Sequence, residues 1–149
     1  MTIFDAIRQD HEIQRKLGAQ LLETHGDSDD RRETFEELRA MLTSHAAAEE
    51  RYFYVPLMEH DLTQDQARHS VAEHKELDDY VEQLESYDRS ASQWLVTARQ
   101  LVERLEHHLD EEEQEVFDLA EQVLTDPQRN ELAADYRGDM ERHLRGDAG

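Results

Sequence analysis

The sequence contains no cysteine, which excludes disulfide bonds, thiol catalysis and metal clusters held by thiolates. It has only five glycines and two prolines in 149 residues, while 36% of its residues are charged. This composition favours one domain of long helices over a sheet. Long apolar runs are also missing: none approaches the roughly 18 residues that a membrane-spanning helix needs. No basic segment followed by an apolar run opens the chain, so we expect a cytoplasmic protein without a signal peptide.

Basic side chains are few compared with acidic ones, and the formal net charge is −21 at pH 7. An electrostatic field of this sign repels the phosphates of nucleic acids and anionic lipid headgroups. Nucleic acids and membrane surfaces are therefore not expected as partners.

The most informative pattern is a histidine followed four residues later by a glutamate, which occurs twice, 63 residues apart. A helix places such a pair on one face, one turn apart. Another histidine precedes each copy by 34 residues, so the chain carries a two-fold repeat. The repeat selects six candidate metal ligands: His11, His45, Glu49, His74, His108 and Glu112.

Apolar residues at helical spacing predict four long helices joined by short loops, the first ending near Gly26. Pro56 is expected to disturb the helix around residues 52–55. The fold class is therefore all-α: an antiparallel up-down-up-down bundle over residues 1–125, with a short additional helix in residues 126–149. The expected N-terminal caps are Thr2 with Asp5, Ser28, Thr63 with Gln66, and Ser90 with Gln93.

Counting from the loops places the six candidates at similar depth in the bundle. His11 and His45 lie about 15 residues on either side of the first turn, and Glu49 and His74 about 9 to 10 from the second. His108 lies about 4 residues deeper, roughly 6 Å, which the loops must absorb. One histidine on an apolar face is usually a core residue, but six polar groups together need partners. A pair of metal ions supplies them.

His107 with Glu111 has the same spacing as His108 with Glu112, so the neighbours must decide between them. His108 shares its face with leucines and valine, whereas His107 has charged neighbours, and the 63-residue offset also selects His108. The remaining histidines fit neither the repeat nor an apolar face and are expected at the surface: His25, His60, His69 and His143. Glu50 and Glu113 are expected in salt bridges at the bundle edge.

Three further residues are candidates for an extra ligand or for catalysis. Asp78 lies one turn after His74, where it could bind metal, accept a hydrogen bond from an imidazole or form a salt bridge. Tyr52 and Tyr54 precede Pro56, and either phenol could bind iron or hydrogen-bond to an iron-bound ligand. Aromatic packing is the alternative for both tyrosines.

These motifs resemble the hemerythrin-like proteins, or HHE cation-binding domains, over roughly residues 3–124. The resemblance implies a four-helix bundle around a non-heme centre of two iron ions. It also implies that the four histidines are terminal ligands and that Glu49 and Glu112 bridge the irons. Oxygen-carrying hemerythrins have a histidine where this chain has Asp78, which argues against a reversible oxygen carrier. Histidine-rich ligation without thiolate suits iron, although zinc and manganese also accept these ligand types.

Three functions remain open from the sequence. The first is enzymatic removal of hydrogen peroxide or nitric oxide at the di-iron site, in defence against oxidative or nitrosative stress. The second is a module that binds, stores or senses dioxygen, nitric oxide or iron without catalysis. The third is a structural bundle with adventitious metal. The sequence does not indicate an oligomeric state.

Overall fold

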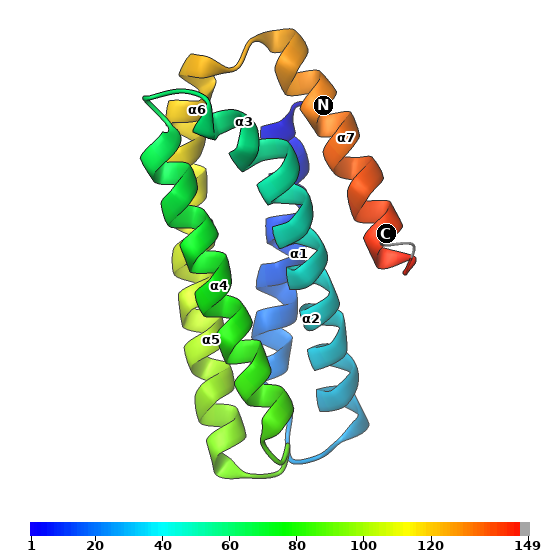
Figure 1. Cartoon of the computed structure of the whole chain (residues 1–149). Helices are drawn as coiled ribbons and strands as arrows, with labels where there is room; N and C mark the ends of the chain where they lie inside the picture. The colour runs from blue at the N-terminus through cyan, green and yellow to red at the C-terminus, as the bar shows by residue number, and fades with distance from the viewer. Residues whose placement is uncertain (147–149) are drawn as a thin grey trace.

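The computed structural model describes residues 1–146, and within this range the chain is helical without strands. Four long helices form the body (Figure 1): α1 (Ile3–Leu22), α2 (Asp29–Glu49), α4 (Gln64–Ser86) and α5 (Ser92–Glu111). Two short helices and a long C-terminal one complete the fold: α3 (Val55–Met58), α6 (Phe117–Val123) and α7 (Asp126–Leu144). Two segments between them are π-helical: η1 (Glu50–Tyr54) and η2 (Glu112–Val116).

The predicted all-α bundle is confirmed, with α1, α2, α4 and α5 side by side and joined alternately at the two ends (Figure 1). Helix α7 spans 19 residues, about as long as α1, and is not the short helix expected from sequence. It packs against α1 and α2, on one side of the bundle, and leaves α4 and α5 uncovered. Within residues 1–146 no helix is long and apolar enough to span a membrane.

The helix starts were predicted only in part. The Thr2–Asp5 capping box and the Ser28 cap are present. The other two predicted capping boxes were wrong. The hydroxyl of Thr63 donates to the carbonyl of Leu57 instead, at 2.5 Å, and α5 begins at Ser92 after Ala91. Short-range hydrogen bonds within the loops satisfy these hydroxyls and so compete with capping.

Each half of the bundle contains a π-helical segment next to a repeated glutamate. The segment η1 begins directly after Glu49, and η2 begins at Glu112. We expected Pro56 to disturb residues 52–55, and η1 does overlap them. Because η2 forms with no proline close to it, whereas Pro56 lies just after η1, the wider turn follows the glutamate-bearing motif in both halves. Such π-helical turns occur frequently at functional sites.

Aromatic side chains fill the core next to the two π-helical segments. The rings of Phe4, Phe53 and Phe117 lie 5.1 to 6.0 Å apart, in tilted and edge-on contacts. Phe117 also stacks on His11, with a centroid distance of 6.3 Å and an interplanar angle of 12°. This buried cluster holds the ligand-bearing turns together and excludes water from one end of the site.

Candidate metal centre

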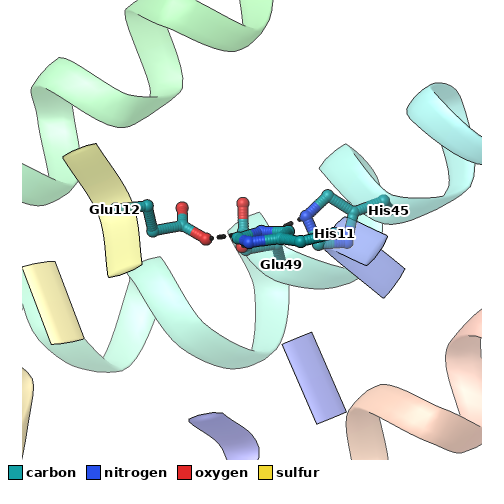
Figure 2. Close-up of side chains that lie close together, drawn as sticks. All are labelled: His11, His45, Glu49 and Glu112. Carbon is teal, nitrogen blue, oxygen red and sulfur yellow. Dashed lines mark ion pairs between the residues drawn. The ribbon is translucent and has the colours of Figure 1, made fainter. Parts of the chain in front are cut away.

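The six candidate ligands converge in the core of the bundle. One group comprises His11, His45, Glu49 and Glu112, whose side chains point toward one another in Figure 2. A second group adds His74 and His108, and again includes Glu49. Within each group the ligand atoms lie within 4.8 Å of one another. Two cations could therefore be held side by side, each by two imidazoles, with Glu49 between them.

The polar atoms at the centre of this cluster need a partner that the protein does not supply. The Nε2 atoms of all four histidines and both oxygens of Glu49 and Glu112 are buried without a hydrogen bond, and they face one another at distances down to 3.0 Å, for His11 with Glu112 and for His74 with Glu49. All six side chains are at least nine-tenths buried. Unpaired buried polar groups are costly, and so many at one point are rare in a stable core. Their nitrogen and carboxylate chemistry fits a pair of transition-metal ions.

Charge in the metal-free cluster is unevenly divided between the two glutamates. Burial opposes ionisation of Glu49, but the nearby imidazoles, His45 foremost, hold its pKa well below the usual value. Burial and the charge of Glu49 together raise the pKa of Glu112 well above the usual value. Without metal, the two carboxyl groups therefore share a proton, which cations would displace.

The outer nitrogen of three imidazoles faces a carboxylate. The Nδ1 atom of His11 lies 2.6 Å from Glu113, and that of His108 lies 2.8 Å from Glu73. His74 Nδ1 lies farther from its carboxylate, 3.7 Å from Glu50. A carboxylate accepts a hydrogen bond from Nδ1–H, which keeps the proton on Nδ1 and leaves the lone pair of Nε2 free for a metal.

His45 is held differently, by a tyrosine of α7. Its Nδ1 atom lies 2.5 Å from the hydroxyl of Tyr136, and this hydroxyl donates to Asp10 over 2.5 Å. Because the single phenolic proton goes to Asp10, the Tyr136 oxygen accepts from His45 Nδ1–H. Arg137 donates to the other oxygen of Asp10 at 2.9 Å. The C-terminal helix thus fixes the orientation and the tautomer of His45.

The family follows from these residues and from comparison with known proteins. The family model of the hemerythrin HHE cation-binding domain matches residues 2–120, a range that includes all six candidates. The chain belongs to this family. Membership implies a cation-binding protein and indicates iron as the cation, in agreement with the resemblance noted from sequence. No curated protein matches the chain.

A solved member of the HHE family has the same fold. The crystal structure of a hemerythrin HHE cation-binding domain-containing protein from Mycobacterium kansasii superposes with a TM-score of 0.86. It is 24% identical in sequence, and the match covers 96% of this chain and 87% of that one. Because the uncovered 4% is shorter than α7, most of α7 lies within the superposed region.

The three other candidates lie at different distances from the HHE centre. Tyr54 is fully buried, its ring centroid lies 5.6 Å from that of His74, and its hydroxyl has no hydrogen-bond partner. Tyr52 is half-buried and packs under the guanidinium of Arg51, 5.3 Å from its ring. Asp78 is exposed at the rim of a cavity beside the centre. Only Tyr54 is therefore placed to approach a bound ion.

Sequence reasoning missed two residues at the centre. Tyr136 was not among the candidates, because nothing in the sequence connects it with His45. Gln14, on α1, is also buried, and neither its amide oxygen nor its nitrogen has a partner. The isolated polar residue on the apolar face that includes Ile7, Leu17 and Leu21 was the available signal for Gln14.

The HHE centre borders a small cavity of about 190 Å³ between α2 and α4. Three of the four ligand histidines contribute to its wall: His45, His74 and His108. Gln14 also lines it, and most of the remaining wall is apolar: Leu42, Ala46, Ala47, Leu77 and Val81. The cavity is large enough for a few small molecules, since one water occupies roughly 30 Å³ of liquid.

Proposed function

We propose that this HHE protein is a non-heme di-iron protein that binds and reacts with hydrogen peroxide, nitric oxide or dioxygen. In this proposal His11 and His45 would hold one iron, His74 and His108 would hold the other, and Glu49 and Glu112 would serve both. The support is the pair of ligand groups that share Glu49, together with membership of a cation-binding family. Reaction with such oxidants suits a role in oxidative or nitrosative stress defence.

The cavity carries this proposal. It gives access to three candidate ligand histidines, its volume admits only small molecules, and the carboxylates of Glu50 and Asp78 in its wall disfavour anions. Peroxide, nitric oxide and dioxygen are neutral and fit these limits, whereas a charged metabolite would lose its hydration against leucine, valine and alanine.

The protein's own residues provide orientation and exclusion of water. Carboxylates and Tyr136 hold the outer nitrogens of the imidazoles, and the phenylalanine cluster closes one end of the site. Gln14 offers an unpaired amide to a molecule in the cavity, as donor or acceptor. Iron, when bound, supplies the electrons that these oxidants require.

Narrowing the cavity tests the proposal. Leucine at position 46, in the variant Ala46→Leu, extends into the cavity beside His45 and should slow the reaction of the iron-loaded protein with peroxide about tenfold. Iron content should stay constant. Ala19→Leu places the same side chain on an exposed face of α1 and should react like wild type. If both variants react at the wild-type rate, access through this cavity is refuted.

The same experiment separates catalysis from binding. Many equivalents of peroxide consumed per protein identify an enzyme. A spectral change that stops after one equivalent, without further consumption, identifies the alternative, a module for binding, storage or sensing. Stopped-flow absorption with each of the three oxidants, followed by measurement of residual oxidant, distinguishes these outcomes.

A further inference from the structure

A second cluster of histidines and glutamates lies on the uncovered side of the bundle, on α4 and α5. It consists of His69 with Glu73 and His107 with Glu111, and each pair has the same four-residue spacing as the buried ligands. The ligand atoms of His69, Glu73 and Glu111 lie within 4.8 Å of one another. The sequence alone suggested only surface histidines here, because the two pairs are far apart in the chain.

The contacts join the two pairs across the helices. His69 Nε2 lies 3.1 Å from an oxygen of Glu111 and 3.5 Å from an oxygen of Glu73. His107 Nε2 lies 3.1 Å from the second oxygen of Glu111. Three side chains, one imidazole and two carboxylates, thus face one point between α4 and α5, and His107 lies beside them on the far oxygen of Glu111.

Exposure and charge favour exchange of a cation with solvent. The side chains of His69 and His107 are 53% and 60% exposed, whereas those of Glu73 and Glu111 are 9% and 18% exposed. The glutamates are therefore held in place while the imidazoles remain reachable from water. The net charge of −21 further attracts cations to the surface.

We propose that His69, Glu73 and Glu111, with His107 supporting Glu111, form a second, exchangeable site for a divalent transition-metal ion. One imidazole and two carboxylates suit Zn²⁺, which open sites hold with three protein ligands and a water, whereas Mg²⁺ and Ca²⁺ prefer oxygen ligands alone. This site is distinct from the buried centre but shares Glu73 with it, because the other oxygen of Glu73 contacts His108.

The repeat explains why the site occurs on one side only. Subtracting 63 from the positions of His69 and Glu111 gives Ala6 and Ala48, both fully buried. Arg137 of α7 donates to the carbonyl of Ala6 at 2.7 Å, so α7 occupies the corresponding place. The side of the bundle without α7 retains the polar cluster and leaves it open to solvent.

Calorimetric titration with Zn²⁺ tests the site. The protein should carry its buried metal, verified by metal analysis before and after, and excess Mg²⁺ should occupy acidic surface groups. Wild type should bind one further zinc ion per chain. The double variant His69→Gln/His107→Gln should bind this ion at least about 100-fold more weakly. Loss of a hydrogen bond that only supports a metal ligand costs roughly 10- to 100-fold, so the loss of imidazole itself should exceed that range.

The control is His25→Gln, which removes an exposed histidine that belongs to no metal-binding group in residues 1–146. It should bind zinc like wild type. All three proteins should melt at similar temperatures, because the substituted side chains are exposed. The proposal is overturned if wild type binds no further zinc, or if the double variant binds it as tightly as wild type does.

Discussion

The two halves of the repeat present the same ligands to the centre but hold them differently. His11 and His45 correspond to His74 and His108, and each pair belongs to its own ligand group. The ring centroids are 5.2 Å apart in the first pair and 5.0 Å in the second. The near-equality indicates that the repeat preserves the side chains that face the candidate centre. The surroundings have diverged.

The two halves differ most in the group that contacts the outer nitrogen, Nδ1, of His45 and of His108. Glu73 reaches His108 directly at 2.8 Å. The corresponding residue, Asp10, is one methylene shorter, and the hydroxyl of Tyr136 lies between it and His45. Helix α7 is therefore part of the centre. Its Tyr136 hydroxyl contacts His45 in one half, where the longer carboxylate of Glu73 contacts His108 in the other.

Loss of one candidate ligand histidine should reduce the iron content equally in either half. We expect about two irons per chain in protein from iron-replete cells, from the two ligand groups. His45→Ala and His108→Ala should each reduce this to about one or fewer, because each leaves one iron with a single imidazole. Metal analysis measures the effect, with His25→Ala as the control. Full iron content in either ligand variant would refute the assigned ligands.

Removal of the bound metal should lower the thermal stability of the whole bundle. Glu49 belongs to both ligand groups, and metal binds only the folded arrangement. Binding at 1,000 times Kd stabilises by about 4 kcal/mol, so chelation should lower Tm by roughly 10 °C in a chain of this size. Calorimetry of loaded and metal-free protein measures the shift. Superimposable curves would contradict a buried centre.

In the metal-free protein, the corresponding histidines His11 and His74 should respond oppositely to pH. Burial lowers the pKa of His11 to about 4. Burial acts on His74 too, but the carboxylates of Glu49 and Glu50 outweigh it and raise its pKa to about 9. Stability from His74 is full below pH 6.5 and is lost as pH rises to about 9. For His11, stability is lost as pH falls from 6.5 to about 4, because the unfolded chain binds the proton.

Urea denaturation of metal-free protein between pH 4 and 9 measures this contrast. Each histidine should change the free energy of unfolding by on the order of 3 kcal/mol across its window. His74→Gln should flatten the alkaline limb and His11→Gln the acid limb. An alkaline limb that persists in His74→Gln would assign it to another group, such as Glu112, whose raised pKa acts in the same direction.

Tyr136, which contacts His45, and Glu73, which contacts His108, should contribute similarly to iron affinity despite their different chemistry. Tyr136→Phe keeps the ring but removes the hydroxyl, and Glu73→Gln removes the charge. Each should weaken iron binding about 10- to 100-fold, the usual cost of losing a supporting hydrogen bond. Competition with a chelator measures the affinity, and Tyr87→Phe, at an exposed site, is the control. Wild-type affinity in Tyr136→Phe would reduce α7 to a packing element.

The sequence predicted the centre better than its surroundings, for a physical reason. Ligands that share a helix face repeat at four residues, and loop positions set their depth, so His45 with Glu49 is readable locally. Tyr136 lies 91 residues from His45 and 126 from Asp10. Such contacts depend on where α7 docks, which no local pattern specifies. The predicted capping boxes at Thr63 and Ser90 did not form, because both hydroxyls make hydrogen bonds within the loops instead.

The smallest effect is expected for Tyr54→Phe, which gives both halves a phenylalanine at this position. Tyr54 corresponds to Phe117 under the 63-residue offset, and the two rings pack on His74 and His11 respectively. Tyr54→Phe removes a buried hydroxyl that has no partner in the metal-free protein. Stability without metal should therefore rise, by up to about 1 kcal/mol.

With iron bound, the phenol of Tyr54 lies close enough to His74 to interact with the centre or with an oxidant. Tyr54→Phe should then change the visible spectrum or the peroxide rate severalfold, with iron content kept. Tyr52→Phe, at a half-buried site outside the centre, should match wild type in both measurements. If Tyr54→Phe gains stability equally with and without iron and leaves spectrum and rate unchanged, Tyr54 only packs. The two halves would then differ functionally through α7 alone.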